Sequence, residues 1–203
     1  MRRVIGIGET ILDILFKNNQ PTVAVPGGSV FNGLVSLGRA GVNVTFISEV
    51  GGDRVGEIIL NFMKDNGICT DNVMVYPERK SPISLAFLND KNDAEYSFYK
   101  DYPTLRLDVD MPEVTSEDIV MFGSFYAITP QLRDKVKELL DKARKVGAII
   151  YYDVNFRSTH AHEAIKLMPT ILENFEYADI VRGSNEDFGN MFGMTEADKV
   201  YQH

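Results

Sequence analysis

The sequence contains no tryptophan, and only one cysteine and three histidines among its 203 residues. A single thiol, Cys69, cannot form an internal disulfide, so the chain is not a small extracellular domain held together by disulfides. The few cysteines and histidines also exclude the cysteine and histidine clusters that form structural zinc sites. These absences suit a reducing compartment, and we expect a cytoplasmic protein.

Positive charge is also scarce, because 21 lysines and arginines face 29 aspartates and glutamates, which gives a net charge of −8. An acidic chain is repelled by phosphate backbones, so we expect no nucleic-acid partner. No apolar run reaches the length that spans a membrane. The apolar stretch near the start is interrupted by Glu9 and Asp13, and no small-residue cleavage site follows it, which argues against a signal peptide.

The sequence does contain an ordinary globular composition, 44% hydrophobic and 25% charged, which is enough for one domain with a substantial core. Apolar runs alternate with amphipathic segments, and this order predicts an α/β domain with a mainly parallel sheet. Strands are expected at residues 4–8, 44–48, 119–123, 148–154 and 178–181, and helices at residues 29–39, 55–66, 131–146, 163–175 and 185–192.

Local signals refine these helices. Gly67 and Gly147 are expected to end two of them in the left-handed conformation. Pro169 must either kink its helix or start a second one, and Thr195 is expected to cap a final helix. In the helix at residues 55–66, the expected inward-facing residues are Ile58, Ile59, Phe62 and Met63.

A second group of strands is predicted at residues 11–16, 22–25, 83–88 and 94–100. The last two flank NDKND, a strong turn signal, and are expected to form a hairpin. Together with the first two they would form a separate small sheet. Strict alternation would place Tyr96 and Phe98 on one face of this sheet, and Tyr99 on the other.

The most informative segment runs from Pro26 to Gly56, PGGSVFNGLVSLGRAGVNVTFISEVGGDRVG. Its glycine pair, Gly27 and Gly28, can adopt backbone angles barred to other residues and allows a ligand to approach the main chain closely. Asn32 follows in the first turn of the expected helix, where its amide could hold a ligand hydroxyl. A plain tight turn into a helix would need glycine, but neither a second glycine nor the asparagine.

This segment resembles the first signature of the PfkB (ribokinase-like) carbohydrate kinases. The spacing from Asn32 to Gly41 to Gly51 fits that signature, whereas Val30 and Leu34 stand where smaller residues are usual. The resemblance implies a three-layer α/β/α sandwich formed by residues 1–203 as one domain. The small sheet, at about residues 11–25 and 82–101, would be a lid over the sugar, through which some members of the family form homodimers.

The resemblance also implies sugar-binding residues. Asp13 stands where the family has an aspartate that accepts hydrogen bonds from sugar hydroxyls, and Gly27, Gly28 and Asn32 would line the same pocket. Glu9 is a weaker candidate. The SFYK segment resembles that of the fructokinase-type and 2-keto-3-deoxygluconate-kinase-type members, in which an aromatic residue contacts the sugar from the lid, and Tyr99 is the residue implied. Simple strand packing is the alternative for its aromatic residues.

Two further segments follow predicted strands, where ligands of open α/β sheets bind. DVNFR resembles the DxNxR of the same branch and implies that Asn155 and Arg157 bind substrate, although a surface ion pair would also explain the arginine. The next segment resembles the family's NxxE motif, with Asn185 implied at the nucleotide. Phe188 stands where its glutamate is expected, so Glu186 or Asp187 would replace it in a shifted register, and Asp187 is the residue assigned to reach the metal through water.

In the family that this chain resembles, ATP bound with Mg²⁺ phosphorylates a sugar hydroxyl. The resemblance also implies a possible monovalent cation as a cofactor. The base in that family lies in a GxGD motif that these 203 residues lack, so we assign no catalytic base before His203. A sheet ending there would leave an exposed edge. We therefore expect the natural chain to continue, and this chain alone to be inactive.

Other functions stay open at this point. A chain that truly ended at residue 203 would be a non-catalytic sugar-binding protein, and a ribokinase or nucleoside-kinase type of member is another alternative. A dinucleotide-binding dehydrogenase is disfavoured, because Gly6 and Gly8 would need a third glycine where Ile11 stands. The sequence also has no Walker-type phosphate loop.

Overall fold

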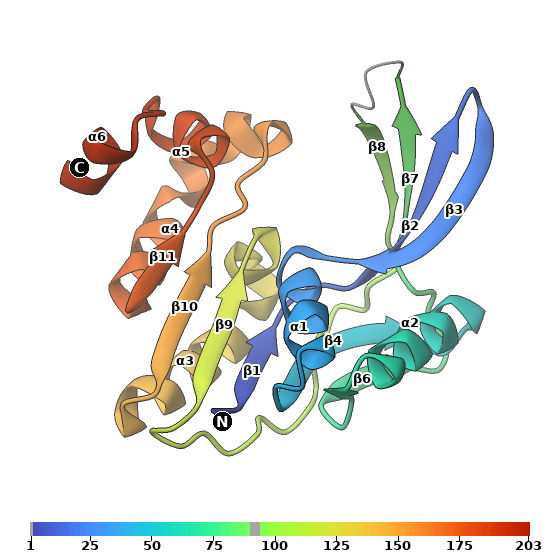
Figure 1. Cartoon of the computed structure of the whole chain (residues 1–203), viewed down its shortest axis with the longest axis horizontal. Coiled ribbons are helices and arrows are strands. Elements are labelled where there is room, and N and C mark those ends of the chain that lie inside the picture. Colours follow the sequence, from blue (N-terminus) through green and yellow to red (C-terminus); the bar gives the residue numbers. More distant parts are fainter. Residues whose placement is uncertain (1, 90–93) are drawn as a thin grey trace.

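Two separate sheets organise the chain in the computed structural model, which describes residues 2–89 and 94–203 (Figure 1). The central sheet has seven strands in the order β11-β10-β9-β1-β4-β5, with β6 also paired to β4, and the small sheet has the order β3-β2-β7-β8. The strands are β1 (Val4–Ile7), β2 (Ile11–Lys17), β3 (Gln20–Gly27), β4 (Val44–Gly51), β5 (Ile68–Cys69), β6 (Val73–Tyr76), β7 (Ile83–Leu88), β8 (Ala94–Tyr99), β9 (Ile119–Gly123), β10 (Ile149–Asp153) and β11 (Ile180–Arg182).

Every described pairing in the central sheet is parallel, which confirms the expected mainly parallel α/β fold. The α-helices are α1 (Ser29–Arg39), α2 (Arg54–Asp65), α3 (Arg133–Val146), α4 (Ala164–Tyr177), α5 (Asn185–Phe192) and α6 (Ala197–Gln202). Short 3₁₀ helices occupy η1 (Phe125–Ile128), η2 (Pro130–Leu132) and η3 (Ser158–Glu163).

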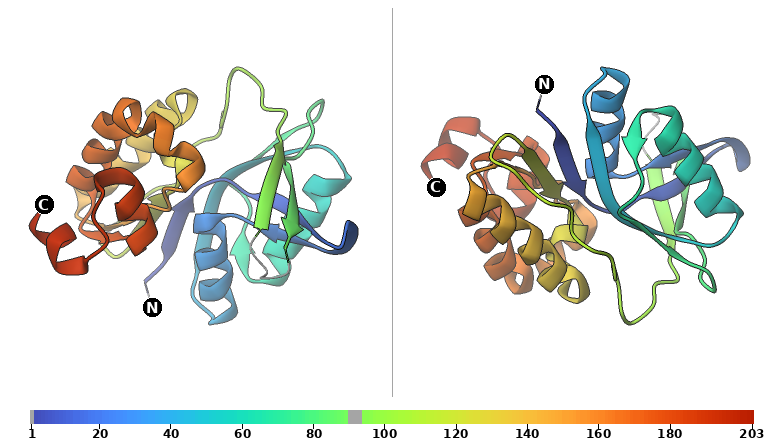
Figure 2. Two further views of the ribbon diagram at one scale, coloured as in Figure 1. Left: turned by 90° about the horizontal axis from the view of Figure 1, so that it is seen from above. Right: turned by 90° about the horizontal axis from the view of Figure 1, so that it is seen from below.

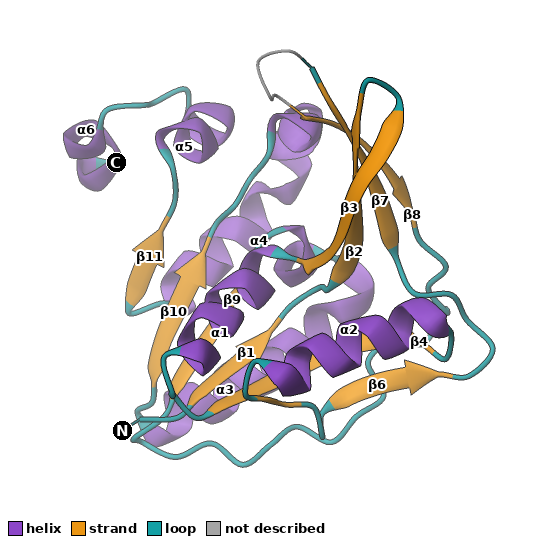
Figure 3. Ribbon diagram, turned by 45° about the vertical axis from the view of Figure 1, so that its right-hand side comes forward, coloured by secondary structure: helices purple, strands orange, loops and turns teal. Residues whose placement is uncertain are grey.

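Helices cover both faces of the central sheet and give three layers (Figures 2 and 3). Val4 of β1 belongs to the core shared with α1 and α2, whereas Ile5 and Ile7 point into the core shared with α3 and α4. Because both faces are covered, β1 and β4 are buried along their whole length, as expected for parallel strands. At Gly6 a Cβ atom would collide with Leu34 of α1, so glycine allows that helix to lie close to the sheet.

Both glycines predicted at helix ends, Gly67 and Gly147, are confirmed, and a side-chain cap is present at another end. The Asp53 carboxylate caps α2 by accepting a hydrogen bond from the Gly56 N–H at 3.0 Å. Partial burial opposes ionisation of this carboxyl, but hydrogen bonds from Ser81 and Gly56 hold the pKa of Asp53 below its ordinary value. Gly67 and Gly147 both follow helices with positive φ angles, 73° and 75°.

Several other predictions made from the sequence differ from the structure. Thr195 does not cap the final helix, because Glu196 is its N-cap and makes no side-chain capping bond. Ile58 is 42% exposed, since the buried stripe of α2 runs through Ile59 and Met63, one position along the helix. No new helix starts at Pro169, because α4 continues through it. The sequence analysis also missed β5 and β6, which are short strands beyond α2.

The small sheet rises from the edge of the central sheet where β1 and β9 end (Figure 1). Strand β2 pairs with β3 in antiparallel and with β7 in parallel fashion, and β8 completes the sheet beside β7. The separate small sheet and its hairpin strands are therefore confirmed. Of the turn expected at residues 89–93, all but Asn89 lies outside the described residues.

Candidate functional site

The carboxyl ends of β1, β9, β10 and β11 share one edge of the central sheet, and α1 begins at that edge (Figure 1). Parallel α/β sheets place ligands at this edge, because neighbouring strands deliver their following loops to the same place. The small sheet stands beside it. The side chains at this edge are therefore the candidates for binding a ligand.

The two glycines before α1 permit close approaches that no other residue would allow. Gly28, the N-cap of α1, has a φ of 142°, and a Cβ atom there would collide with the backbone oxygen of Glu9. At Gly27 a Cβ atom would collide with Oδ2 of Asp13. The glycine pair thus brings the end of β1, the start of α1 and the Asp13 carboxylate together.

Asp13 projects from β2 next to these glycines and is only partly satisfied. Its Oδ1 accepts a hydrogen bond from the Ser84 hydroxyl of β7, while Oδ2 has no hydrogen-bond donor among the described residues. Burial raises the pKa of the Asp13 carboxyl, and the negative charge of Glu9 adds to this, whereas the bond from Ser84 opposes it. A half-buried carboxylate with a free oxygen can accept hydrogen bonds from ligand hydroxyls.

Asn32 lies on α1, one turn beyond the glycine pair. Its side chain is exposed and has no hydrogen-bond partner within residues 2–89 and 94–203, and its backbone N–H bonds to Gly28 in the usual helical manner. The amide is therefore free for a ligand, and its predicted role stays a prediction.

The ends of β9 and β10 carry two non-glycine residues in the left-handed region, Ser124 with φ 58° and Asn155 with φ 42°. The Asn155 amide donates to the Ser124 hydroxyl at 3.2 Å, and the Ser124 N–H donates to the backbone oxygen of Asp153 at 2.9 Å. Such conformations cost about 1–3 kcal/mol each and concentrate at functional sites. The sequence analysis singled out Asn155 but had no signal for Ser124.

Asp153 links three elements at the same edge. Its Oδ2 accepts from the Ser29 hydroxyl of α1 at 3.0 Å, and its Oδ1 accepts from Arg182 Nη1 of β11 at 3.0 Å. The hydrogen bond from this carboxylate raises the pKa of Arg182. Asp153 therefore holds α1, β10 and β11 together at this edge of the sheet. Arg157, two residues beyond Asn155, is exposed and has no hydrogen bond or ion pair among the described residues, so its role is untested.

Asn185 and Asp187 open α5, which starts at the capping residue Ser184. Asp187 Oδ2 accepts from both the N–H and the hydroxyl of Ser184, at 2.7 and 2.8 Å, which closes a capping box. Asp187 is only 3% exposed, and its Oδ1 is buried without a partner within the described part of the chain. Asn185 Oδ1 accepts from the Glu186 N–H, and the residue lines an apolar cavity of about 510 Å³.

The structure does not bring Tyr99 to Asp13. Strand register places Asp13 beside Ser84 and Ser84 beside Phe98, so these three share one face. Tyr99 lies on the opposite face, and both Tyr99 and Phe98 line a second cavity at the base of β8 together with Lys80. The predicted alternation is confirmed, since the rings of Tyr96 and Phe98 stack on one face with their centres 5.8 Å apart. The aromatic residue that shares a face with Asp13 is therefore Phe98 and not Tyr99.

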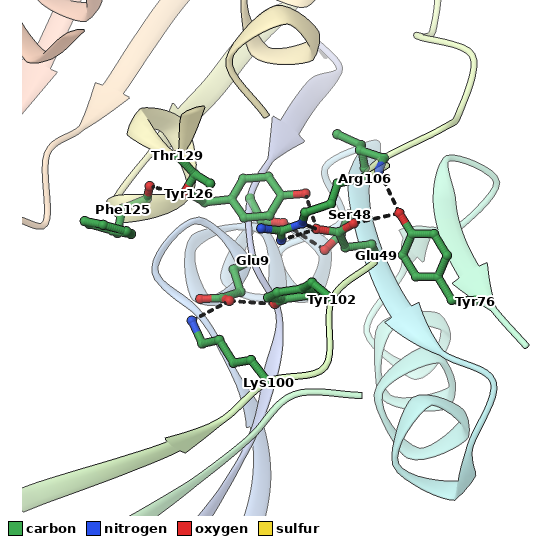
Figure 4. Close-up of polar contacts among 12 residues, drawn as sticks. Glu9, Ser48, Glu49, Tyr76, Lys100, Tyr102, Arg106, Phe125, Tyr126 and Thr129 are labelled. Carbon is green, nitrogen blue, oxygen red and sulfur yellow. Dashed lines mark hydrogen bonds and ion pairs between the residues drawn. The ribbon is translucent and has the colours of Figure 1, made fainter. Parts of the chain in front are cut away.

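Polar contacts that were not predicted from the sequence connect Glu9, just after β1, with the segment that follows β8 (Figure 4). Glu9 Oε1 accepts from Lys100 Nζ at 2.7 Å and from the Tyr102 hydroxyl at 2.6 Å. Deeper in the core, Glu49 of β4 is 1% exposed and pairs with Arg106. The available signal was a single charged residue inside β4, whose other residues are uncharged.

Within the described residues, no cluster of three or more histidine, cysteine or acidic side chains could hold a metal ion by itself. The same residues form no helix with the length and apolar character needed to cross a bilayer.

Comparison with known proteins gives consistent matches along the whole chain. The model of the pfkB family of carbohydrate kinases matches residues 1–203. Probable fructokinase-6, chloroplastic, of Arabidopsis thaliana is 26% identical over 195 residues, covering 91% of this chain and 51% of the relative. The 5-dehydro-2-deoxygluconokinase of Clostridium perfringens is 30% identical over 183 residues, covering 86% and 53%. The chain thus spans about half the length of these relatives.

The fold has close counterparts among solved structures. A fructokinase double mutant from Vibrio cholerae O395, in a form with fructose, ADP and potassium ion bound, superimposes with a TM-score of 0.84 at 19% identity. The match covers 100% of this chain and 66% of that one. The central sheet, its helices and the small sheet are therefore a ribokinase-like arrangement.

Proposed function

Because the chain belongs to the pfkB family of carbohydrate kinases, we propose that it forms the sugar-binding part of an enzyme that transfers a phosphoryl group from ATP to a sugar hydroxyl. The observation that carries this proposal is the Asp13 carboxylate, held against Gly27 with its Oδ2 free of hydrogen-bond donors among the described residues. The kinase names of the relatives support an enzyme rather than a binding-only protein.

In this proposal the chain binds and orients the acceptor sugar. Asp13 accepts hydrogen bonds from two neighbouring hydroxyls, and Asn32 and Asn155 contribute amide groups from α1 and the end of β10. Arg157 and Tyr99 contribute at the rim if the segments that bear them move toward the sugar. Phosphoryl transfer depends mostly on such positioning. No described residue is assigned as the base that deprotonates the attacking hydroxyl.

The charges at the site favour a neutral sugar of the fructose type. Glu9 and Asp13 present two carboxylates at the edge, and the Lys100 ammonium there is already paired with Glu9 at 2.7 Å. A substrate carboxylate would meet like charge there, which disfavours binding. A sugar acid of the 2-keto-3-deoxygluconate type is the second candidate, because a kinase of the deoxygluconate type is among the relatives.

ATP with Mg²⁺ is the proposed phosphoryl donor. Among the described residues the buried Oδ1 of Asp187 has no donor, which fits a hydrogen bond from a water molecule on a bound Mg²⁺. Asn185 would lie near the nucleotide. When bound, Mg²⁺ neutralises charge on the phosphates. A monovalent cation is also proposed, supported by the potassium-bound fructokinase. A cytoplasmic location completes the proposal, in keeping with one free cysteine.

We further propose a homodimer formed through the small sheet. The face that bears Asp13 also carries Val23, Val25, Tyr96 and Phe98, each between 41% and 56% exposed. An apolar face of this kind on a sheet is a typical protein interface.

The proposal is tested by calorimetric titration of this chain with fructose, 2-keto-3-deoxygluconate, ribose and adenosine, and by assay of ATP consumption with each. We expect fructose to bind most tightly. Preference for the sugar acid would select the second candidate, and preference for ribose or adenosine would contradict the fructose assignment. Absence of binding by every sugar would overturn the proposal. Because the chain spans about half the length of these relatives, sugar binding by this chain is the decisive readout.

A further inference from the structure

A buried ion pair links β4 to the segment that returns from the small sheet. Glu49 is 1% and Arg106 is 9% exposed, and Arg106 donates to Glu49 Oε1 through Nε at 2.9 Å and through Nη2 (Figure 4). Tyr76 donates to Oε2 at 2.9 Å, and Tyr126 donates to Oε1 at 3.3 Å. Both carboxylate oxygens are therefore satisfied.

Such a pair is a poor source of stability, because removing two charges from water costs about as much as their attraction returns. A second contact of Arg106, with Tyr102, indicates that the pair has a role other than stability. The guanidinium carbon of Arg106 lies 3.6 Å from the centre of the Tyr102 ring, close enough for a cation–π contact. Arg106 thus supports Tyr102 from behind while Glu49 holds Arg106.

Tyr102 in turn reaches the candidate site. Its hydroxyl donates to Glu9 Oε1 at 2.6 Å, the oxygen that also accepts from Lys100. Burial and the charge of Glu9 raise the pKa of Tyr102, so the phenol keeps its proton and remains a donor. Contacts therefore run without interruption from Glu49 through Arg106 and Tyr102 to Glu9.

These contacts lie in the segment through which the chain leaves the small sheet. β8 ends at Tyr99, and the chain then passes from the small sheet back toward β9. Tyr102 fixes the start of this return segment. Its end is fixed by Arg106 and by the Leu107 N–H, which donates to the Tyr76 hydroxyl at 2.7 Å. Between Tyr102 and Arg106, Leu105 is 70% exposed, so the contacts of Tyr102 and Arg106 hold this stretch of the return segment.

We propose that Tyr102 and Arg106 are positioning residues, which, backed by Glu49, hold the root of the small sheet against the end of β1 and so fix the Glu9 carboxylate and the Lys100 ammonium at the sugar site. Only the part that concerns the sugar rests on the proposed function. Arginine suits this role because its planar fork bonds to Glu49 while its face lies on the ring, and lysine cannot do both.

The test compares Tyr102→Phe, Arg106→Lys and the double variant with a matched pair elsewhere. Tyr177 provides that match, because its hydroxyl donates to Asp141 at 2.6 Å and Arg144 lies 4.3 Å from its ring centre, far from the site. Tyr177→Phe and Arg144→Lys therefore remove the same kinds of contact. Melting temperature, hydrogen exchange of β7 and β8, and affinity for fructose are measured for every variant.

We expect Tyr102→Phe and Arg106→Lys each to speed exchange in β7 and β8 relative to the central sheet and to weaken fructose binding about tenfold, the loss of one hydrogen bond to a charged group. Because Arg106 acts through Tyr102, the double variant should bind fructose with nearly the same affinity as the single variant that binds it more weakly. The Tyr177 and Arg144 variants should change neither readout.

Unchanged exchange in β7 and β8 for Tyr102→Phe would overturn the proposal, and so would fully additive losses of affinity. A lower melting temperature alone, with exchange raised evenly over the chain, would indicate a merely structural pair and also overturn it. If Arg106→Lys fails to fold, Tyr102→Phe still decides. If the unaltered chain binds no sugar, the proposed function fails, and hydrogen exchange alone decides whether the two residues position the small sheet.

Discussion

Asp13 shows how one side chain combines a cost in stability with a capacity for binding. Its carboxyl is half-buried beside Glu9 and has one hydrogen-bond donor in the described part of the chain, Ser84. A carboxylate so placed is under-satisfied in the protein alone, and ligand hydroxyls would supply the missing donors. Residues that bind polar ligands commonly carry such a cost, because the best arrangement for folding would bury or pair them fully.

Replacing Asp13 by asparagine should therefore separate binding from stability. Because burial raises the pKa of Asp13 above its ordinary 3.8, the folded chain gains stability from the protonated form at low pH and loses it as pH rises through the raised pKa. At neutral pH, Asp13→Asn should melt at the same temperature or higher, and the difference should vanish below the ordinary pKa. Fructose affinity should fall about 10- to 100-fold, as for a lost hydrogen bond to a charged group.

Calorimetric titration and thermal melts at several pH values check this prediction. Asp71→Asn, at an exposed aspartate between β5 and β6, is the control and should change neither quantity. Unchanged fructose affinity in Asp13→Asn, with the fold intact, would contradict the assignment of Asp13 to the sugar.

At the scale of elements, the start of α1 is the most constrained point of the site. The helix has no side-chain cap, and its N-cap Gly28 occupies a conformation open only to glycine, against the oxygen of Glu9. A helix start that displays free backbone N–H groups is suited to polar ligands. Two features restrict position 28 to glycine: its φ angle and the closeness of the Glu9 main-chain oxygen.

Gly28→Ala should thus cost both stability and binding. We expect a loss of about 2–4 kcal/mol in the free energy of unfolding, from strain plus a main-chain collision, and no measurable fructose binding. Gly41→Ala is a matched control, because Gly41 also has a positive φ, 80°, but a Cβ atom there meets nothing within 4 Å. It should lose about 1 kcal/mol and bind fructose normally. Denaturant titrations and calorimetry measure both, and a Gly28→Ala chain that binds fructose normally would refute the role given to this turn.

The elements that sequence predicted best were those with strong local signals. Buried runs of branched residues located β1, β4, β9 and β10, and left-handed glycines located helix ends. The failures involved short or shifted features. Two-residue β5 exists only because β4 lies beside it, and Ile58 differs from Ile59 only by one step around α2. Local pattern does not contain the neighbour that decides such cases.

At the scale of the whole molecule, the small sheet leaves one apolar face open. The rings of Tyr96 and Phe98 are 53% and 56% exposed on the face that also bears Val23 and Val25. Because this face also bears Asp13, a second copy seated on it would lie close to the sugar site. The proposed dimer and the proposed binding site are therefore neighbours.

Sedimentation equilibrium tests the dimer. The unaltered chain should be a dimer, and Tyr96→Lys should shift it toward monomer, because a charge would be buried in an apolar contact. Ile165→Lys, at a 93% exposed residue of α4, is the control and should leave the dimer intact. A chain that is monomeric across the micromolar range would contradict the proposal, as would equal effects of the two substitutions.

The sequence by itself determined the fold class, the separate small sheet and the glycine-rich entry to α1, because each depends on short-range patterns of apolar residues and glycines. It also singled out Asp13 and Asn155, through a resemblance between motifs. Only the tertiary structure decided which residues meet. The register of β2, β7 and β8 placed Phe98 rather than Tyr99 on the face of Asp13. The contacts of Glu49, Arg106, Tyr102 and Glu9 join three distant segments. No local pattern encodes a bond between residues 57 positions apart, because such a bond exists only after the sheets have formed and brought its partners together.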